Sequence, residues 1–339
     1  MTIAVPQDPD HAVSCFDRSD RLRMQFTGTK AAESLTGLVT NDVLALRGSD
    51  GLYACALTAK GRVIADVRVL AMPSEDGVVT TLLVDANAAG GVGFAAMIRK
   101  YVNPRLAKYL DVSASTSCLS LDGPGAIALL QSLGADATET DAVAGGPDFT
   151  HRAIVVANMP VRLARVPDLG AATTFDLHLE RSSVEAMRDA LIGAGAVARD
   201  AVEWHRRRVL AGRPEWGVDM DESTLAQEAN MDALHAISYR KGCYTGQETV
   251  ARVHFRGHVN RTLRRVSYPG ATVPAIGTSL IGPEGAPVGD ARSTADDQGG
   301  NSAGIAMLRR EVATGSTLVW LDIQNEKQTA VVLDAADEA

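Results

Sequence analysis

The sequence predicts an α+β protein in which two mixed units of strands and helices precede a C-terminal part built of strands. Three observations lead to this prediction. A strand that runs into a glycine and then into a helix occurs twice, near Gly28 and near Gly123; short connections join neighbouring strands; and no long helix fits after Arg265. Antiparallel strands with helices between them favour layered α+β units over a doubly wound parallel sheet. A chain of 339 residues has room for two or three such units.

The first unit opens with a strand of period two that ends just before Gly28. Two later β-prone runs flank the tight connection Ala59-Lys60-Gly61, which is typical of a hairpin. A stretch rich in Ala and Gly then shows helical periodicity, and Pro104 closes the unit. The predicted elements, in chain order, are a strand at 22–26, a helix at 30–39, strands at 52–57, 63–70 and 78–84, and a helix at 86–102.

The second unit repeats the opening of the first. Gly28, Ala32 and Leu35 have the same spacing as Gly123, Ile127 and Leu130. Two capping boxes, Ser182-x-x-Glu185 and Asp200-x-x-Glu203, predict the starts of two helices, which we expect to end near Gly195 and Gly212. The other predicted elements are a strand at 118–122, a helix at 126–133 and strands at 154–156, 161–166 and 173–179.

The C-terminal part consists of short β-prone runs separated by Gly/Pro turns, as at Pro269-Gly270 and Gly299-Gly300. Such regular short strands predict a small antiparallel barrel or sandwich. The predicted strands lie at 265–268, 278–281, 302–307, 317–323 and 329–333.

Composition narrows the class of protein. The chain is 46% hydrophobic and 22% charged with a mean hydropathy of +0.00, which is typical of a soluble globular protein. A net charge of −8 argues against a protein whose whole surface binds nucleic acid. Residues 1–11 contain no apolar core of signal-peptide length, and no run is long enough to span a membrane. The four cysteines are widely spaced and form no Cys-x-x-Cys pair, so we expect a reduced, cytoplasmic protein. No coiled coil or long apolar edge strand stands out, and we expect a monomer.

The densest group of unusual residues lies between positions 209 and 262. Cys243 follows Lys241 by two residues, and cationic neighbours favour a thiolate, although a lone cysteine between glycines is more often structural. His254 and His258 are four apart with no third ligand in view, so no metal site is predicted. The run Arg206–Arg208 is interpreted as a solvated helix face. Between 240 and 265 the basic residues outnumber the single acidic Glu248, which makes a basic strip suited to an anionic ligand. The strip comprises Arg240, Lys241, Arg252, Arg256, Arg261, Arg264 and Arg265.

One motif resembles a known family. The run Lys241-Gly242-Cys243-Tyr244-Thr245-Gly246-Gln247-Glu248 is similar to the signature of the YgfZ-type folate-binding proteins, relatives of the glycine-cleavage T-protein, an aminomethyltransferase. Shorter stretches extend the resemblance over most of the chain. They are Phe26-Thr27-Gly28, Leu38 to Val43, Ala59 to Val63 and Ala211 to Pro214.

This resemblance implies two ferredoxin-like α+β modules and a C-terminal antiparallel β-barrel, arranged as a ring around a channel that binds tetrahydrofolate or a one-carbon-substituted form of it. We expect the modules at 1–115 and 116–255, with the N-terminal residues able to join the second module, and the barrel at 256–339. The cysteine motif ends the second module, and we expect it between that module and the barrel, near the channel.

The resemblance also assigns roles to residues. Cys243 would act as a thiol on a sulfur, cluster or one-carbon species, and Asp66 would be the acidic group near the folate. Lys241, as a cation two residues before Cys243, would lower the pKa of the thiol. Gly242, Gly246 and Glu248 complete the motif. The residues expected to bind folate are Asn41, Arg62, Asp66, Tyr244, Gln247, Arg252 and Arg256.

Differences from the T-protein pattern help to choose between the functional hypotheses. Where the T-protein has a pair of aspartates this chain has Ala65 and Asp66, and where it has a pterin-binding Glu this chain has Leu210, which cannot accept a hydrogen bond from the pterin. We therefore expect a folate-binding accessory protein that supports iron–sulfur cluster assembly or repair, with iron–sulfur clients or assembly factors as partners. The alternative is an aminomethyltransferase or other one-carbon transferase. A tRNA-binding module that uses the basic strip is the weaker alternative.

Overall fold

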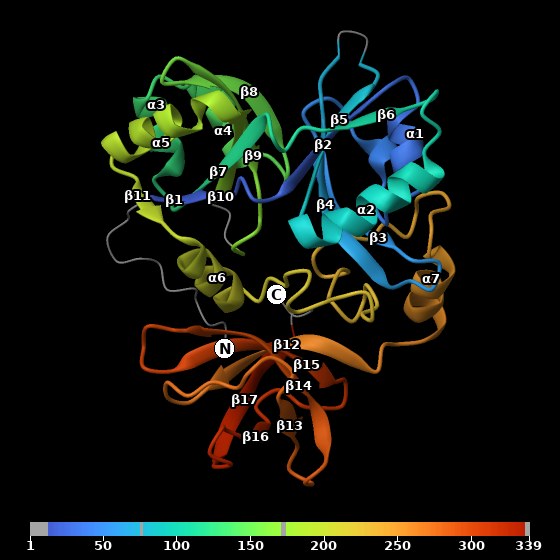
Figure 1. The fold of residues 1–339 in the computed structure, drawn as a ribbon, viewed down its shortest axis with the longest axis vertical. Coiled ribbons are helices and arrows are strands. Elements are labelled where there is room, and N and C mark those ends of the chain that lie inside the picture. The colour runs from blue at the N-terminus through green and yellow to red at the C-terminus, as the bar shows by residue number, and fades with distance from the viewer. Residues whose placement is uncertain (1–12, 75–76, 171–173, 336–339) are drawn as a thin grey trace.

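The computed structural model describes residues 13–74, 77–170 and 174–335. The stretch 1–11, where the sequence shows no signal-peptide core, and Thr173, the first residue of one predicted strand, lie outside the described residues. Two α+β units lie side by side above a C-terminal barrel, and an irregular segment occupies the place where the three parts meet (Figure 1). The predicted α+β class and the ring of three parts are confirmed.

The first unit is built on a five-stranded sheet, called here the first sheet, with strand order β3-β4-β5-β2-β6. The predicted hairpin is confirmed, because β3 and β4 pair antiparallel on either side of the connection at 58–62. Helix α2 packs its Phe94, Met97 and Ile98 onto this sheet. The elements are β2 (Leu22–Thr27), α1 (Ala31–Thr36), the 3-10 turn η1 (Val43–Ala45), β3 (Gly51–Leu57), β4 (Val63–Ala71), β5 (Thr81–Ala86), α2 (Ala88–Tyr101) and β6 (Lys108–Asp111).

The second unit is built on a six-stranded sheet, the second sheet, with strand order β11-β1-β7-β10-β9-β8. Its elements are β1 (Ser14–Asp17), β7 (Thr116–Asp122), α3 (Ala126–Ser132), α4 (Ala137–Gly145), β8 (His151–Val156), β9 (Met159–Arg165), β10 (Thr174–Glu180), the 3-10 turn η2 (Arg181–Ser183), α5 (Val184–Gly193), β11 (Val197–Arg199) and α6 (Ala201–Leu210).

The two units repeat one topology. Gly28 and Gly123 have φ values of 137° and 141°, and each leads from a strand into the first helix of its unit. A Cβ on Gly28 would lie 2.6 Å from the carbonyl oxygen of Leu106, so only glycine fits this turn. In the second sheet β1 takes the antiparallel place beside β7 that β6 takes beside β2. The strand at Ser14–Asp17 therefore completes the second unit.

Side-chain capping explains where helices α6 and α4 begin, but not α5. Asp200 accepts a hydrogen bond from the Glu203 N–H at 2.9 Å, so the second predicted capping box is confirmed. The first predicted capping box, Ser182-x-x-Glu185, is wrong: Ser182 lies inside the turn η2, and Ser183, which precedes α5, makes no side-chain cap. Helix α4 was not predicted from the sequence. Asp136 caps it by accepting from the Glu139 N–H at 3.0 Å, so the same Asp-x-x-Glu spacing could have found it.

The C-terminal strands close into a six-stranded barrel in the order β12-β15-β14-β13-β16-β17. The predicted barrel or sandwich is thus a barrel, and it packs Tyr268 and Trp320 edge to face in its core. One strand, β14, was missed because its sequence contains Gly289, Asp290 and Arg292 in place of an apolar run. The strands are β12 (Arg261–Tyr268), β13 (Ser279–Ile281), β14 (Pro287–Asp296), β15 (Ser302–Arg309), β16 (Thr317–Leu321) and β17 (Lys327–Ala335).

Two further features bear on the class of protein. In the described ranges, no helix has the length and apolar character that crossing a membrane requires. All four cysteines are unpaired, and Cys243 is exposed while Cys15, Cys55 and Cys118 are buried. Cys243 is therefore the thiol that solvent can reach.

Candidate functional site

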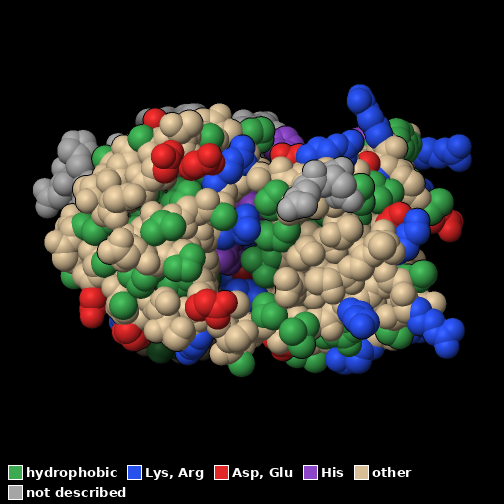
Figure 2. Space-filling model, turned by 90° about the horizontal axis from the view of Figure 1, so that it is seen from above, with side chains coloured by type: hydrophobic (Ala, Val, Ile, Leu, Met, Phe, Trp, Pro, Cys, Tyr) green, Lys and Arg blue, Asp and Glu red, His purple; other side chains and the backbone are tan. Residues whose placement is uncertain are grey.

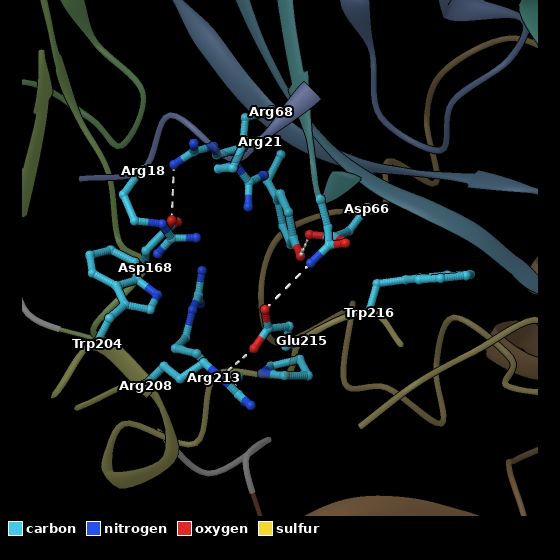
Figure 3. A pocket seen from close by; sticks show the side chains of 13 residues that line it. Arg18, Arg21, Asp66, Arg68, Asp168, Trp204, Arg208, Arg213, Glu215 and Trp216 are labelled. Carbon is cyan, nitrogen blue, oxygen red and sulfur yellow. Dashed lines mark hydrogen bonds and ion pairs between the residues drawn. The ribbon is translucent and has the colours of Figure 1, made fainter. Parts of the chain in front are cut away.

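A polar pocket of about 50 Å³ lies where the two sheets meet the irregular segment after α6. We call it the central pocket; Figure 3 shows the side chains that line it. A larger space of about 600 Å³ adjoins it and shares Arg18, Trp204 and Glu215 with it; we call this the outer pocket. The central pocket is lined by Arg18, Arg21, Tyr53, Asp66, Arg68, Asn87, Asp168, Trp204, Arg208, Arg213, Pro214, Glu215 and Trp216.

Regular spacing along one strand and one helix brings four of these side chains to the pocket. Asp66 and Arg68 are two residues apart on β4 and therefore share one face of the first sheet. Trp204 and Arg208 are four apart on α6 and share one face of that helix. After α6 the chain turns at Gly212, whose φ of 70° suits glycine, and this turn directs the segment beginning at Arg213 along the pocket.

Asp66 has a buried carboxylate with one unused oxygen. The Tyr53 hydroxyl donates to Asp66 Oδ2 at 2.9 Å, whereas Asp66 Oδ1 is buried without a hydrogen-bond partner. Burial raises the pKa of Asp66 above its ordinary value, and burial together with the Asp66 charge raises the pKa of Tyr53, which stays a donor. A buried acceptor without a partner is costly and requires an explanation. A ligand with an N–H or O–H donor at this place would supply one.

Arg18 offers an unused donor in the same pocket. Its guanidinium lies over the Trp204 ring at 3.8 Å from the centroid, and its Nη1 is buried without a hydrogen-bond partner. Five arginines and three carboxylates line the central pocket, so the lining is net positive. The pocket can therefore accept a hydrogen bond from a ligand at Asp66 and donate one to an acceptor or anion at Arg18.

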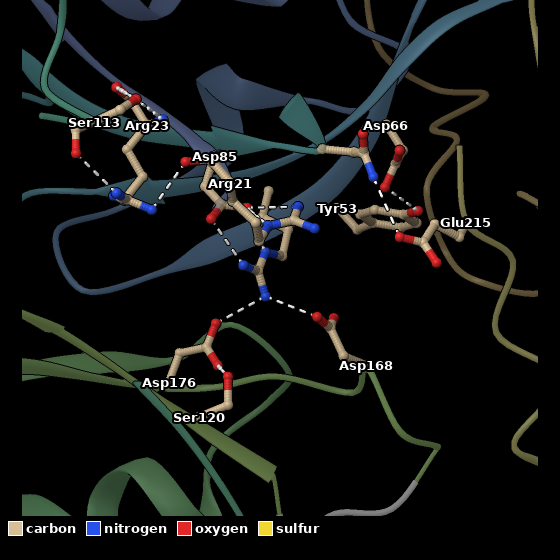
Figure 4. Close-up of polar contacts among 12 residues, drawn as sticks. Arg21, Arg23, Tyr53, Asp66, Asp85, Ser113, Ser120, Asp168, Asp176 and Glu215 are labelled. Carbon is tan, nitrogen blue, oxygen red and sulfur yellow. Dashed lines mark hydrogen bonds and ion pairs between the residues drawn. The ribbon is translucent and has the colours of Figure 1, made fainter. Parts of the chain in front are cut away.

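Behind the pocket, a buried network of ion pairs joins the two sheets (Figure 4). Arg68 donates to both oxygens of Asp85 at 2.8 Å, to Asp176 at 2.8 Å and to Asp168 at 2.9 Å. Arg21 adds a second cation 2.7 Å from Asp85. Burial alone would raise the pKa of Asp85, but the charges of Arg21 and Arg68 outweigh it and hold the pKa well below its usual range. The network fixes Arg21 and Arg68 along the pocket wall.

Lys241 of the cysteine motif fastens the motif to the first unit. Its ammonium donates to the carbonyl oxygens of Thr36 at 2.5 Å, Val39 at 2.6 Å and Asn41 at 2.8 Å. Thr36 is the last residue of α1, which was predicted to extend to Val39, and the other two carbonyls follow the helix. Burial lowers the pKa of Lys241 to about 8. The motif was expected between the second module and the barrel, near the channel; the hydrogen bonds of its Lys241 run to the first unit.

The rest of the motif packs against the tip of the β3–β4 hairpin. Gly246 has a φ of 85°, and a Cβ there would lie 2.6 Å from the Thr58 carbonyl oxygen, so only glycine fits. Helix α7 (Gln247–Arg256) starts directly after it. Tyr244 is buried, while Cys243 is exposed. The hairpin and α1 together therefore present Cys243 to solvent, and it lines neither the central nor the outer pocket.

Of the residues predicted to bind folate, Asp66 lines the central pocket. Asn41 donates to the carbonyl oxygens of Tyr53 and His235, both at 2.9 Å. Arg62 bonds the Ser223 carbonyl oxygen and lies 3.7 Å from Glu228. The others lie in or beside α7: Tyr244, Gln247, Arg252 and Arg256.

Several residues of the central pocket were not predicted from the sequence. The run Arg206–Arg208 was interpreted as a solvated face, but Arg208 is buried and pairs with Asp219 at 2.7 Å. It also donates to Ser293 of β14, so it ties α6 to the barrel. Arg18 and Arg21 stand out little in the sequence; the available signal was the alternation of Asp66 and Arg68 on one predicted strand.

The basic strip does not form one surface. Arg264 is buried and donates to the Val312 carbonyl oxygen at 3.1 Å, and Arg261 pairs with Glu228 at 3.0 Å. Arg252 and Arg256 are exposed on α7. The strip is thus divided between structural contacts and an exposed helix.

Comparison with known proteins places this geometry in context. The family model described as the GCVT N-terminal domain matches residues 8–239. A relative from Neurospora crassa, named iron–sulfur cluster assembly factor IBA57 homolog, mitochondrial, is 30% identical over 275 residues, which are 78% of this chain and 56% of that protein. A protein of the same name from Mycosarcoma maydis is 25% identical over 259 residues and is likewise covered over 56% of its length. The chain thus spans little more than half of these two relatives.

A bacterial relative and a solved structure are covered more fully. The tRNA-modifying protein YgfZ of Escherichia coli O157:H7 is 27% identical over 264 residues, which are 75% of this chain and 72% of that protein. The crystal structure of the glycine cleavage system aminomethyltransferase T from Bartonella henselae superposes with a TM-score of 0.81 at 17% identity, over 96% of this chain and 86% of that one. At this identity the match supports the fold alone.

Proposed function

The chain belongs to the GCVT N-terminal domain family, and from this premise we propose that it binds tetrahydrofolate in the central and outer pockets and supports iron–sulfur cluster assembly or repair through Cys243. The observation that carries the proposal is the unpartnered Oδ1 of Asp66 in a pocket lined by arginines. Tetrahydrofolate carries one-carbon units, and this chain supplies the groups that hold it.

The residues present fit the chemistry of a folate. A pterin ring presents N–H donors, and Asp66 Oδ1 is a buried acceptor with no protein donor. Trp204 and Trp216 offer flat apolar surfaces beside the pocket. The glutamate tail of a folate ends in carboxylates, for which an arginine such as Arg18, with its free Nη1, is the matching donor. The outer pocket of about 600 Å³ adds the space that the 50 Å³ central pocket lacks.

The same geometry argues against the aminomethyl transfer of the T-protein. Ala65 is fully buried in the core beneath α2, where Gly90 approaches it, while Asp66 faces the pocket. Adjacent residues of a strand point to opposite faces, so this chain brings a single carboxylate from this pair to the pocket. Leu210 does not line the pocket, so it does not replace the missing pterin-binding Glu.

Cys243 is the candidate for the iron–sulfur role. Its thiol is exposed and is held at the surface by the backbone contacts of Lys241 and Gly246. Thiolate sulfur is the usual protein ligand of iron–sulfur clusters, and one cysteine binds a cluster only together with ligands from a partner. An exposed free thiol also suits a reducing compartment, and we propose the cytoplasm. The IBA57 relatives are named iron–sulfur cluster assembly factors, which supports the proposed iron–sulfur role of this chain.

Isothermal titration with tetrahydrofolate tests the binding half of the proposal. We expect one site in the wild type, weaker binding by at least tenfold in Asp66→Ala, because the ring then loses its buried acceptor, and unchanged binding in Cys243→Ser. Glu222→Ala is the matched control, since it removes an exposed carboxylate away from the pocket. Wild-type affinity in Asp66→Ala would overturn the assignment of the pocket.

Complementation tests the functional half. In a strain that lacks the gene, the wild type should restore the activity of iron–sulfur enzymes, and Cys243→Ser should fail although it still folds and binds folate. The matched control is Cys15→Ser, which alters a buried thiol. Full restoration by Cys243→Ser would show that the thiol is not required for the function, and it would not bear on the proposal that the chain binds folate.

A one-carbon transferase remains the second candidate, because burial raises the pKa of Asp66 and a buried carboxyl can act as general acid or base. Turnover of an aminomethylated carrier protein with tetrahydrofolate, lost in Asp66→Asn, would favour this candidate. Folate binding without turnover favours the accessory role.

A further inference from the structure

A second large cavity lies between the two sheets, on a face that the central pocket does not reach. It has a volume of about 510 Å³ and shares no lining residue with the central pocket; we call it the upper groove. Figure 2 shows the hollow between the two units with basic and histidine side chains inside it. The first sheet contributes Arg23 and Gln25 among others, and the second sheet contributes Arg162 and His178 among others.

A group of three potential metal ligands lies at the wall of this groove. The ligand atoms of Cys118, Asp176 and His178 all lie within 4.8 Å of one another. The pairing of β7 with β10 sets this arrangement, because Cys118 is directly opposite His178 in the antiparallel register. Asp176 precedes His178 by two residues on β10 and shares its face of the sheet. His178 also lines the upper groove, so the group borders the groove on the side of this residue.

One member of this group has an unexplained polar atom. His178 Nδ1 is buried without a hydrogen-bond partner. Burial lowers the pKa of His178, so the imidazole is neutral and keeps a lone pair. A buried ring nitrogen without a partner is rare in native proteins, and a ligand bound to it would account for it.

The other two members keep the capacity to bind a metal. Asp176 is fully buried and accepts from Arg68 at 2.8 Å and from the Ser120 hydroxyl, one bond for each oxygen. Each carboxylate oxygen has a second lone pair. Cys118 is fully buried, and burial raises the pKa of its thiol, so metal binding must release the thiol proton to solvent.

The charges around the group are close to balanced. Besides Asp176, the charged groups that influence Cys118 and His178 include Asp85, Arg23 and Arg68. Two carboxylates thus face two guanidinium groups before any metal binds. A divalent ion that exchanges for the thiol proton adds one net positive charge to the site.

We propose that Cys118, Asp176 and His178 bind one divalent transition-metal ion of the Zn²⁺ class, with its remaining coordination position open to water from the upper groove. Thiolate, imidazole and carboxylate are the ligand types that zinc takes in proteins, and three protein ligands with an open position are typical of zinc sites that bind a further ligand. This site goes beyond the proposed function and differs from the His254/His258 pair considered in the sequence. The sequence could not show it, because strand register alone brings position 118 beside position 178.

Titration with Co²⁺ tests the proposal on the full, reduced, metal-free chain. A Cys243→Ser background removes the exposed thiol as a competing ligand. We expect one Co²⁺ for each chain, with thiolate-to-cobalt charge-transfer absorption and the d–d bands of four-coordinate cobalt, both abolished by an excess of Zn²⁺. His178→Ala should weaken Co²⁺ binding at least tenfold, and Cys118→Ser should remove the charge-transfer band. The matched control Cys15→Ser changes another buried thiol and should leave the spectrum unchanged.

Circular dichroism and thermal melting without metal show whether each variant folds. Should Cys118→Ser fail to fold, His178→Ala decides the question, because this side chain reaches the groove and is only partly buried. No Co²⁺ binding in the Cys243→Ser background would overturn the proposal. So would binding that persists with wild-type affinity in folded His178→Ala, or a charge-transfer band that persists in folded Cys118→Ser.

Discussion

Replacing Arg68 by Met should destabilise the protein more than any surface substitution. The change removes the guanidinium that joins Asp85 of the first sheet to Asp168 and Asp176. Removing one partner of a buried ion pair costs about 3–5 kcal/mol. Asp85 keeps Arg21 and Asp176 keeps a bond from Ser120, so we expect about 3 kcal/mol, the lower end of that range. At ~2 °C for each kcal/mol, the melting temperature should fall by roughly 6 °C.

The pH dependence of this loss tests its cause. The folded-state pKa of Asp85 lies below its unfolded value, so its contribution to stability is present above about pH 3.9 and is lost as pH falls further. The deficit of Arg68→Met should therefore be largest at neutral pH and shrink in acid, as the orphaned carboxylates become protonated. Urea unfolding of the wild type and the variant at neutral and acid pH measures both effects. The exposed Arg105→Met is the control, expected within about 0.5 kcal/mol of the wild type. A deficit below about 1 kcal/mol, or one that grows in acid, would refute the reasoning.

Three further predictions concern the motif and the contact between the units. Gly246→Ala should destabilise the chain by about 1–3 kcal/mol in urea unfolding, because φ is 85° and a Cβ would meet the Thr58 carbonyl oxygen. Gly242→Ala is the control: a Cβ there has nothing within 4 Å, so this variant should be nearly neutral in the same assay. Burial lowers the pKa of His151 to about 3, so the stability of the folded state should fall as pH drops below about 6.5, by roughly 2 kcal/mol between pH 6.5 and 5. His151→Gln should lessen this dependence of stability on pH. An unchanged dependence would contradict the assignment of the effect to His151. Iodoacetamide should label the native protein at Cys243 and all four cysteines in denaturant; native labelling of a second cysteine by mass spectrometry would disprove the burial of that thiol.

Local patterns were enough for much of the fold. The hairpin around Gly61, the glycines that open α1 and α3, and the Asp200 cap each depend on neighbours within a few residues, and the structure confirms them. Elements without an apolar pattern escaped prediction, as β14 shows: its stability comes from pairing with β13 and β15 rather than from its own sequence.

The candidate site was predicted less completely, for a physical reason. Asp66 was found because a recognisable hairpin precedes it, but its partner Tyr53 and the arginines around it come from separate segments of the chain. Lys241 was predicted to lower the pKa of Cys243 because it lies two residues before it in the sequence. The structure shows its ammonium bound to three carbonyls about 200 positions away, which no local spacing can reveal.

By itself the sequence determined the α+β class, the strand-rich C-terminal part and the motif that carries Cys243. These depend on periodicity, turn residues and an unusual run of eight residues, which are properties of neighbours along the chain. Only the tertiary structure decided that Asp66 keeps a free oxygen among arginines, that Lys241 fastens the motif to the first unit, and that Cys118 lies opposite His178. Each of these follows from strand register and the packing of distant segments, which fix burial and charge without leaving a local pattern.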